Sequence, residues 1–333
     1  MKIVVLGGGS SAERQISLDT SIEILQALRK NGHKAIFVDM LLDADTSAQM
    51  ADALFEAEDG LIANFEQSRL LSPQEAKEIV KKRHNRHLGN GVAEICSRAD
   101  FVFIGLHGEG GEDGKIQALL DLSGIPYNGS DTLGSAVAMN KEMARHVMRD
   151  IGILVAPLTR HAPCIVKPVD SGSSIGLKLC QTEQELEAAL AEANSDKLLI
   201  EKRIIGREFT VPVLGERALV PVELIPPKGC ILDYEVKYAD GDKGKKIICP
   251  AVLSPEISEK LRQLALHLHK HMHQSVYSRT DFIVDEQGQI WCLEINTLPG
   301  MTSHSALPVA AAYEGMDFPA LCEEIIRLSL NKG

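Results

Sequence analysis

Apolar residues at the start of the chain alternate between strand and helix spacing, which predicts a parallel sheet. The run KIVVL at 2–6 is typical of a buried strand, and a glycine-rich loop follows it. A helix then follows with Leu18, Ile22, Leu25 and Leu28 on one side and stops at Gly32, and AIFV at 35–38 is a second strand. A strand, a helix and a strand in succession place parallel strands in one sheet. We therefore expect residues 1–129 to form an α/β domain.

Residues 42–98 interrupt this pattern with a polar stretch of helical character. Ser72 is a good N-cap there, because Pro73 suits the first helical position and Glu75 can return a hydrogen bond to the cap. The apolar run FVFIGLHG at 101–108 then resumes the pattern of a buried strand. We expect residues 42–98 to be a peripheral helical insertion in the first domain.

The second half of the chain has a different pattern, with many short strands and few helices. Strand-like runs at 164–168 and 197–202 flank a helix that we expect at 183–193. This succession is typical of α+β structure with antiparallel pairing. The expected domains are 1–129, 130–200 and 201–333.

Residues 279–300, RTDFIVDEQGQIWCLEINTLPG, are typical of a β-hairpin with charge on one face. A turn centred on Gln287 and Gly288 sets polar residues of the two strands opposite one another in two pairs, Asp281 with Glu294 and Arg279 with Asn296. Because side chains alternate with a period of two, these residues share one face. The other face is apolar and can pack in a core: Phe282, Val284, Leu293 and Ile295.

Two carboxylates and an amide on one face of a hairpin favour a metal site. Side chains directly opposite lie within about 5 Å, so Asp281 and Glu294 repel one another unless a cation lies between them. Together with the oxygen of Asn296 they form an all-oxygen set, which suits Mg²⁺ or Mn²⁺. The alternative is a solvated hairpin with ordinary surface charges.

Composition narrows the class of protein. The 333 residues are 44% hydrophobic and 24% charged, as in ordinary globular domains. The net charge of −11 argues against nucleic-acid binding, which needs a basic surface. The seven cysteines form no CxxC pair, so they indicate neither a zinc site nor a disulfide framework, and we expect a reducing, cytoplasmic location. No apolar run suits a signal peptide or a membrane span, so we expect no membrane partner.

The loop GGGSSAER at 7–14 has two interpretations. Its small residues match a loose dinucleotide fingerprint, with Asp39 at the end of the next strand. The match is weak, because the carboxylate of Glu13 is unfavourable beside a pyrophosphate. Glu13 suits a substrate ammonium group instead, or else it only favours the helix dipole.

Lysines beside small-residue loops are candidates for binding phosphate. Lys167 ends a predicted strand just ahead of SGSSIG at 171–176, where loop amides could cover phosphate oxygens. Lys141 is either a second phosphate lysine or a surface residue. Residues 201–204 end another strand whose backbone edge could meet an adenine, with Glu208 in reach of ribose hydroxyls.

Histidines occur in two notable places. The tract HLHKHMH at 267–273 belongs to a helix expected at 255–273, with its histidines on flanking and exposed faces, so a metal site is the less favoured interpretation. His107 ends a buried strand at the edge where α/β proteins bind ligands, and it is either a site residue or a structural hydrogen-bonding group.

Several motifs occur along the chain in a fixed order: GGGSSAERQISL, LHGEGGEDGKIQ, IVKPVDSGSSIG, EKRIIGREFTV, DYEVKY, RTDF and LEINTLPGMTSHS. Taken together they resemble the D-alanine–D-alanine ligases of the ATP-grasp superfamily, over nearly the whole chain except 42–98. The resemblance implies an ATP-grasp fold, of α/β and α+β class, that follows a Rossmann-like N-terminal domain. It also implies that ATP is gripped between the central and C-terminal domains.

The resemblance assigns roles to individual residues. Those implied to bind ATP are Lys141, Lys167, Ser173, Glu201, Lys202, Ile204, Glu208 and Phe209. Those implied to hold two Mg²⁺ or Mn²⁺ ions are Asp281, Glu294 and Asn296.

Further residues match the positions that bind and activate the amino acids. Glu13, with His107 nearby, is implied to bind the ammonium group of the first D-alanine. Arg279 and the amide of Gly300 are implied to stabilise the oxyanion. Ser305, beside Ala306, is implied to hold the carboxylate of the second substrate. The implied closing loop and its hydrogen-bonded link to Glu13 contain Lys237, Tyr238 and Ser173.

The resemblance implies that a homodimer joins two D-alanines through a D-alanyl phosphate, with ATP, for peptidoglycan precursor synthesis.

Two residues depart from the family pattern. Ala306 stands where many members have leucine, which leaves room for D-serine as second substrate, and Gln15 replaces an acidic residue. Tyr238 resembles the dipeptide-forming members, so we favour D-alanine. Other open interpretations are an NAD-dependent oxidoreductase and a regulator that binds ATP without chemistry.

Overall fold

The computed structural model describes residues 1–44, 53–56, 60, 65–170, 172, 175–193, 197–227, 231–232, 236 and 244–332. The chain divides into two compact units. Unit 1 contains Met1–Ala136, His273–Ser278 and Thr297–Gly333, and unit 2 contains Val137–Met272 and Arg279–Asn296. The expected division into three domains stays a prediction. None of the helices in the described part of the chain has the length and apolarity needed to cross a membrane.

The elements of unit 1 are β1 (Lys2–Gly7), α1 (Arg14–Lys30), β2 (Lys34–Asp39), α3 (Phe65–Leu70), α4 (Pro73–Lys82), α5 (Val92–Ser97), β3 (Phe101–Ile104), α6 (Lys115–Leu122), α12 (Ala306–Tyr313) and α13 (Phe318–Leu330). Helix α7 (Thr132–Met139) begins in unit 1 and ends in unit 2. The elements that lie in unit 2 are α8 (Lys141–Asp150), β4 (Cys164–Pro168), β5 (Lys178–Cys180), α9 (Glu183–Glu192), β6 (Leu198–Lys202), β7 (Gly206–Leu214), β8 (Arg217–Ala218), β9 (Val222–Ile225), β10 (Lys246–Ile248), α11 (Pro255–His271) and β12 (Ile290–Asn296). Strand β11 (Tyr277–Asp285) runs from the end of unit 1 into unit 2.

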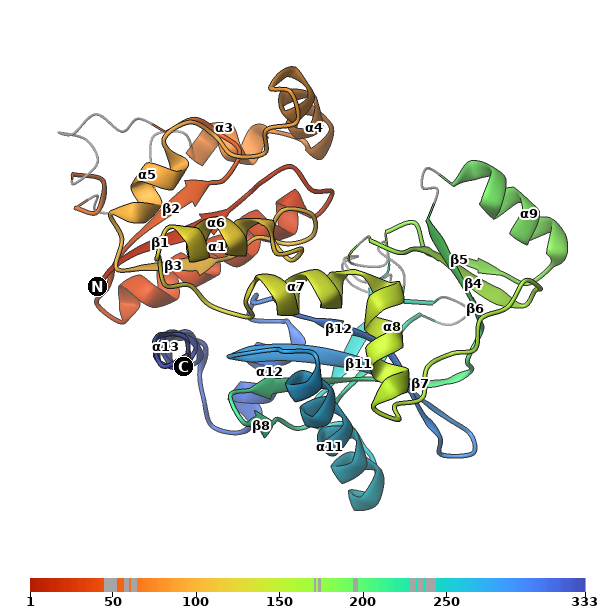
Figure 1. The fold of residues 1–333 in the computed structure, drawn as a ribbon. Helices are drawn as coiled ribbons and strands as arrows, with labels where there is room; N and C mark the ends of the chain where they lie inside the picture. The colour runs from red at the N-terminus through yellow and green to blue at the C-terminus, as the bar shows by residue number, and fades with distance from the viewer. Residues whose placement is uncertain are drawn as a thin grey trace. The chain divides into compact units, whose positions relative to one another are not determined.

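Unit 1 contains the parallel sheet that the apolar pattern predicts. Its strands lie in the order β2-β1-β3 and pair in parallel, with α1 packed against β1 and β2 (Figure 1). Val5 at the centre pairs with Phe37 on one side and Phe103 on the other, and all three side chains are fully buried. Strand β3 is shorter than expected, so His107 lies in the loop beyond its end.

The segment expected as a peripheral insertion contributes to the core of unit 1. Ser72 caps α4 as predicted, since its hydroxyl accepts from the Glu75 amide at 3.2 Å and the Glu75 carboxylate accepts from the Ser72 amide. The preceding α3 packs against β2 and buries Ser68 completely. The described residues of this segment therefore help to build the fold around β2.

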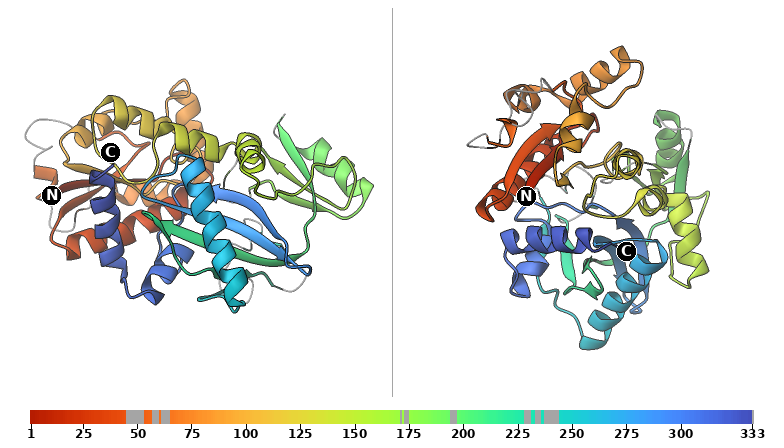
Figure 2. Two further views of the ribbon diagram at one scale, coloured as in Figure 1. Left: turned by 60° about the horizontal axis from the view of Figure 1, so that its bottom comes forward. Right: turned by 60° about the vertical axis from the view of Figure 1, so that its left-hand side comes forward.

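Unit 2 contains two antiparallel sheets. The smaller sheet has the strand order β5-β4-β6, and α9 covers one of its faces (Figure 1). The larger sheet has the order β10-β9-β7-β11-β12, with β8 beside β7, and α11 crosses it (Figure 2). Its core buries Phe209, Leu261, Phe282 and Ile295. The fold thus combines α/β and α+β structure, as the sequence predicts.

The hairpin of β11 and β12 has the predicted pairing but a different turn. Arg279 pairs with Asn296 and Asp281 with Glu294, as expected. Nearer the turn, Phe282 pairs with Cys292, so the register shifts by one residue at a bulge. The observed turn is centred half a residue earlier than predicted. The bulge compensates for this shift, so that Asp281 still pairs with Glu294.

The bulge also moves one side chain to the other face. In a bulge two residues of one strand oppose one residue of its partner, which interrupts the alternation of faces. Leu293 therefore lines a cavity together with Glu294, whereas Cys292 and Ile295 pack in the core. The prediction that Leu293 belongs to the core face was wrong, because strict alternation takes no account of a bulge.

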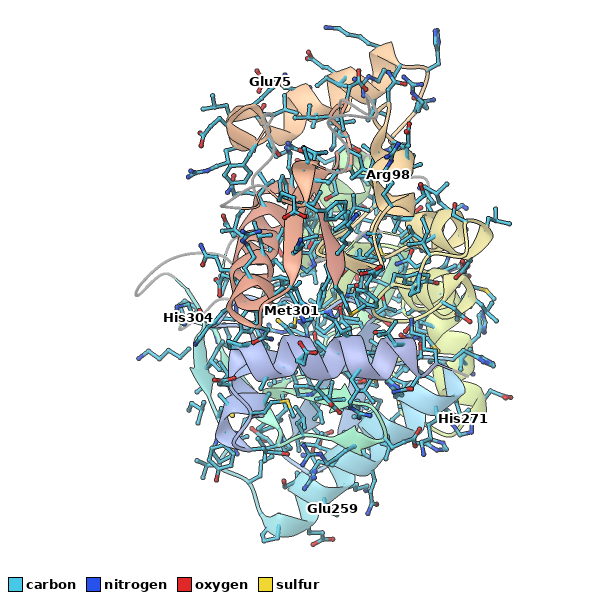
Figure 3. The ribbon with its side chains drawn as sticks, turned by 90° about the vertical axis from the view of Figure 1, so that its left-hand side faces the viewer. Glu75, Arg98, Glu259, His271, Met301 and His304 are labelled. Carbon is cyan, nitrogen blue, oxygen red and sulfur yellow. The ribbon has the colours of Figure 1, made fainter. Side chains whose placement is uncertain are left out.

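Helix α11 buries one histidine of the tract HLHKHMH. His267 and His271 are exposed, and Figure 3 shows His271 and Glu259 at the outer side of this helix. His269 is only 4% exposed, and burial lowers its pKa from 6.5 to about 4. The expectation that the histidines all lie on flanking or exposed faces was therefore wrong for His269.

Candidate active site

A cavity of about 370 Å³ lies within unit 2, between its two sheets. One part of its wall is apolar and includes Ile165, Leu177, Ile204, Ile283 and Leu293. The polar part contains cationic and anionic side chains, Lys141, Lys167, Glu201, Glu208, Asp281 and Glu294. A cavity with an apolar wall and a few charged groups suits a ligand with a flat apolar part and a charged part.

Lys167 is held at the cavity wall by a buried charge cluster. Its Nζ lies 2.6 Å from Oε2 of Glu201, and the guanidinium of Arg145 pairs with Oε1 of the same carboxylate. Arg145 also donates to the carbonyl oxygen of Ala156 at 2.9 Å. With two cations and one anion the cluster carries a net positive charge, which suits a phosphate ligand.

Lys141 reaches the same cavity from the start of α8. Asn140 caps this helix by accepting from the Met143 amide at 3.0 Å, which fixes the first turn. The Lys141 amide donates to the carbonyl oxygen of Val169 at 2.9 Å, and Lys141 is only 9% exposed. The structure thus brings Lys141 and Lys167 to one cavity, which removes the surface interpretation of Lys141.

Asp281 and Glu294 lie opposite one another in the hairpin, and both line the cavity. Asp281 is almost fully buried and accepts two hydrogen bonds from Arg279, each of 2.9 Å. Thr210 on β7 donates to the same carboxylate at 2.5 Å. These contacts fix the direction of the Asp281 carboxylate. They also remove the interpretation of a solvated hairpin with ordinary surface charges.

The hairpin residues have the chemistry of a divalent-metal site. Burial raises the pKa of the Cys292 thiol well above its usual value, and the nearby charges of Asp281 and Glu294 add to this effect. The side-chain nitrogen of Asn296 is buried with no hydrogen-bond partner, which leaves the orientation of this amide open to a ligand. Among the described residues no three His, Cys, Asp or Glu side chains converge, so a metal site in the hairpin would need the Asn296 amide as a third protein ligand. Two carboxylates and an amide oxygen fit Mg²⁺ or Mn²⁺.

The link between β6 and β7 forms another wall of the cavity, where we expect adenosine. Lys202, Ile204 and Glu208 all line it. Phe209, in contrast, is fully buried in the hydrophobic core, because it points to the other face of β7 from Glu208. The Phe209 side chain therefore packs in the core, and its part in binding ATP stays a prediction.

The glycine-rich loop of unit 1 surrounds a buried ion pair. Arg14 and Asp39 are at most 1% exposed, and their closest atoms are 2.5 Å apart. Ser68 donates to the same Asp39 carboxylate, and the Leu41 amide donates to it at 2.8 Å. Gly8 has a φ of +71°, and a Cβ there would lie 2.5 Å from Asp39. Asp39 is therefore fully engaged in the fold and is closed to the ribose of a dinucleotide.

Glu13 and His107 belong to one buried cluster in unit 1. A Cβ on Gly108 would lie 2.5 Å from Oε2 of Glu13, so that carboxylate rests against the loop that carries His107. The His107 ring is 3.1 Å from the hydroxyl of Thr20 and 3.5 Å from the Glu112 carboxylate. Glu13 is 3% exposed and His107 is 6% exposed. The structure thus brings together the two residues that we expect to bind the first amino acid.

Gly300 and Ser305 are also neighbours in unit 1. A Cβ on Gly300 would lie 2.8 Å from Oγ of Ser305, so a larger residue at 300 would force the Ser305 side chain to move. The Ser305 hydroxyl lies 2.9 Å from that of Thr302. Ser305 occupies the N-cap position of α12, but its side chain makes no hydrogen bond to the first turn of the helix. Ala306, the first residue of α12, is buried.

Two family models match this chain. The model of the D-Ala-D-Ala ligase N-terminus matches residues 2–130, and that of the C-terminus matches residues 138–327. A D-alanine–D-alanine ligase of Halalkalibacterium halodurans is 38% identical, and the alignment covers 100% of both chains. The chain belongs to the D-alanine–D-alanine ligase family.

Solved structures of the D-alanine–D-alanine ligase family agree with this assignment. A ligase from Bacillus anthracis complexed with ATP matches with a TM-score of 0.71 and 26% identity, over 99% of this chain and 97% of that one. The VanG D-Ala:D-Ser ligase from Enterococcus faecalis matches with a TM-score of 0.73 and 26% identity, over 98% and 99%. Both likenesses identify the ATP-grasp fold.

Three of the predicted site residues of this D-alanine–D-alanine ligase family member lie outside the described residues: Ser173, Lys237 and Tyr238.

Other residues at the site belong to no motif and were not predicted from the sequence. Arg145 follows Lys141 by one helical turn, and Thr210 follows Glu208 on the same face of β7. Helical and strand periodicity could therefore have indicated both, given the site residues beside them.

Proposed function

We propose that this chain catalyses the ATP-dependent joining of two D-alanines to D-alanyl-D-alanine, for the synthesis of peptidoglycan precursors. The observation that carries the proposal is the cavity in which Lys141 and Lys167 share a wall with the Asp281 and Glu294 pair. Lysines offset the charge of the phosphates, and the carboxylate pair supplies the metal ligands that a nucleotide triphosphate needs. A dinucleotide cofactor has no use for the carboxylate pair.

The first step is phosphoryl transfer from ATP to the carboxylate of one D-alanine. A carboxylate is a poor electrophile, and the acyl phosphate that forms is a reactive one. Lys167 lies against Glu201, so we propose that Glu201 and Arg145 position this lysine for the phosphates. Asp281, Glu294 and Asn296 would hold Mg²⁺ or Mn²⁺, as two ions, which offsets negative charge on the transferring phosphoryl group.

The second step is attack by the amine of the other D-alanine on the acyl phosphate. The tetrahedral intermediate carries a negative oxygen, and hydrogen-bond donors directed at that oxygen lower the barrier by about 3–4 kcal/mol each. Arg279 and the amide of Gly300 are the donors that we propose. Arg279 is partly buried beside Asp281, and its guanidinium is always charged at neutral pH.

Glu13 is the group that we propose for the ammonium of the first D-alanine. A carboxylate that is 97% buried stabilises a cation more than an exposed one does, because water screens it less. His107 lies in the same buried cluster, and we propose that it contacts the same substrate. Lys237, Tyr238 and Ser173 remain our candidates for a loop that closes over the site and excludes water, so that the acyl phosphate is not hydrolysed.

The second candidate function is a D-alanine–D-serine ligase. Ala306 favours it, because a residue smaller than leucine beside Ser305 leaves room for the hydroxyl of D-serine. The likeness to a solved D-Ala:D-Ser ligase is consistent with this selectivity only as a family relationship.

We also propose that the protein is a homodimer and acts in the cytoplasm, where ATP is available. Sedimentation of the purified chain at several concentrations tests the dimer.

Phosphate release from ATP tests both candidates. The chain is incubated with ATP and Mg²⁺, and with D-alanine, D-serine, D-lactate or L-alanine, alone and paired with D-alanine. We expect phosphate release and D-alanyl-D-alanine with D-alanine alone. Faster release with D-serine present, and a mixed dipeptide, would favour the second candidate. No release with any D-amino acid would refute both.

A further inference from the structure

Two cysteines face each other across the small sheet of unit 2. Cys164 on β4 pairs directly with Cys180 on β5. They are 0% and 1% exposed, and they pack with Leu186 and Ala189 of α9. Both are free thiols in the structure. The site proposed above uses neither of them.

The geometry of this pair suits a disulfide. Residues directly opposite in an antiparallel pair have Cβ atoms about 4.5–5.5 Å apart, and a disulfide needs them about 3.5–4.5 Å apart. Each thiol is close enough to the other to affect its pKa. Closing the bond therefore requires only a small approach of the strands. Cys96, Cys292 and Cys322 have no cysteine opposite them among the paired strands of the described residues.

We propose that Cys164 and Cys180 are a site of reversible oxidation, which low-molecular-weight disulfides convert to an intramolecular disulfide. The Cys180 thiolate attacks the oxidant RSSR, forms a mixed disulfide and releases one thiolate RS⁻. The Cys164 thiolate then attacks Sγ of Cys180 and releases the second RS⁻. Two protein thiols are thus oxidised to one disulfide, and one RSSR is reduced to two RSH.

The order of attack follows from the different surroundings of the two thiols. Burial raises the pKa of both thiols, but the neighbouring Cys164 opposes that rise at Cys180 and so favours the Cys180 thiolate. Strand β5 has three residues and lies at the edge of its sheet, so it is paired on one side only. Short edge strands open more easily than central ones, which gives the oxidant access to Cys180.

The disulfide would close a ring from residue 164 to residue 180. That ring includes Lys167, Pro168 and Leu177 of the cavity wall. A cross-link of this length lowers the conformational entropy of the unfolded chain, so the oxidised protein should be more stable than the reduced one. Oxidation thus acts on the segment of chain that carries a phosphate lysine.

The test uses the full chain incubated with oxidised glutathione, followed by alkylation in denaturant and peptide mapping. We expect a cross-linked pair of peptides that contains Cys164 and Cys180, loss of both thiols, and full recovery after dithiothreitol. The melting temperature should rise by about 6–12 °C on oxidation. Cys164→Ser should abolish the cross-link and the rise, whereas the matched control Cys322→Ser should keep both.

Three results would overturn the proposal: full alkylation of Cys164 and Cys180 after oxidation, a mixed disulfide with glutathione that never resolves, or a cross-link to another cysteine. The peptide map of the oxidised wild-type protein distinguishes these results without any variant. A variant that fails to fold therefore does not prevent the test. Cys180→Ser provides a second variant with the same expected loss. None of these measurements depends on ligase activity.

Discussion

At the scale of single residues, the site depends on charged side chains that hold one another. Glu201 bridges Lys167 and Arg145, and Asp281 is held by Arg279 and Thr210. A motif identifies the residue that meets the ligand but not the residue that positions it. Arg145 and Thr210 were missed from the sequence for this reason, since their role exists only once the chain is folded.

Arg145→Met should raise the KM for ATP about tenfold, equivalent to about 1.4 kcal/mol, and change kcat little. Without Arg145, both oxygens of Glu201 remain available to Lys167 and draw its ammonium away from the phosphates. Initial rates at varied ATP concentration measure the effect. Arg149→Met, an exposed position on the same helix, is the control. An equal loss in both variants would contradict the positioning role.

Arg279→Met should lower kcat by about 10²–10³ and leave ATP binding largely intact. The guanidinium is the proposed donor to the oxyanion, which forms only after the nucleotide is bound. Calorimetric binding of ATP and single-turnover kinetics separate the two effects. If Arg279 only fixes Asp281, the variant should instead show a raised requirement for Mg²⁺ at an unchanged kcat.

At the scale of elements, the hairpin shows what a residue pattern can and cannot predict. Cross-strand pairing of Asp281 with Glu294 follows from the spacing of charged and apolar residues. The bulge at Leu293 does not, because the turn and the bulge each shift the register and their effects cancel at Asp281. The same holds for His269: helical spacing places it near the edge of the buried face, and only packing decides that it is buried.

Leu293→Ala and Ile295→Ala form a matched pair on β12 that tests the bulge. Leu293 lines the cavity, so its truncation should raise the KM for ATP several-fold with a small change in stability. Ile295 packs in the core, so its truncation should lower the free energy of unfolding by about 2–5 kcal/mol. Urea unfolding and steady-state kinetics measure both. Equal effects of the two substitutions would contradict the assignment of faces.

His269 should make the stability of the protein depend on pH. Its pKa is about 4 in the folded protein against 6.5 when unfolded, because burial disfavours the charged ring. The unfolded chain therefore binds a proton that the folded chain does not, and this cost appears as the pH falls below 6.5 and grows down to about 4. Glu216 opposes the shift and Lys270 adds to it.

Between pH 7 and pH 5 the titration of His269 should lower the free energy of unfolding by about 2 kcal/mol. Urea unfolding of the wild type and of His269→Gln at both pH values isolates this contribution. The variant should lose less stability than the wild type over this range. The exposed neighbour His271→Gln is the control and should behave as the wild type does. Identical pH dependence of all three proteins would contradict the burial of a neutral His269.

At the scale of the whole molecule, the order of the motifs predicts the family, and the comparisons confirm it. The parallel sheet of unit 1 and the antiparallel sheets of unit 2 follow from apolar periodicity. The contribution of residues 65–98 to the core around Asp39 could not be predicted from the sequence. Arg14 donates a hydrogen bond to Ser68, and these two residues come together only in the folded chain. Polar composition alone suggested a peripheral insertion.

The central claim is that the carboxylate of D-alanine is activated as an acyl phosphate before the peptide bond forms. Transfer of ¹⁸O tests it directly, with D-alanine labelled in both carboxylate oxygens, ATP and Mg²⁺. Attack of the amine breaks the bond between the acyl carbon and the bridging oxygen, so the released phosphate keeps that oxygen. We predict one ¹⁸O atom in each phosphate by mass spectrometry, together with D-alanyl-D-alanine. Phosphate without ¹⁸O would contradict the account.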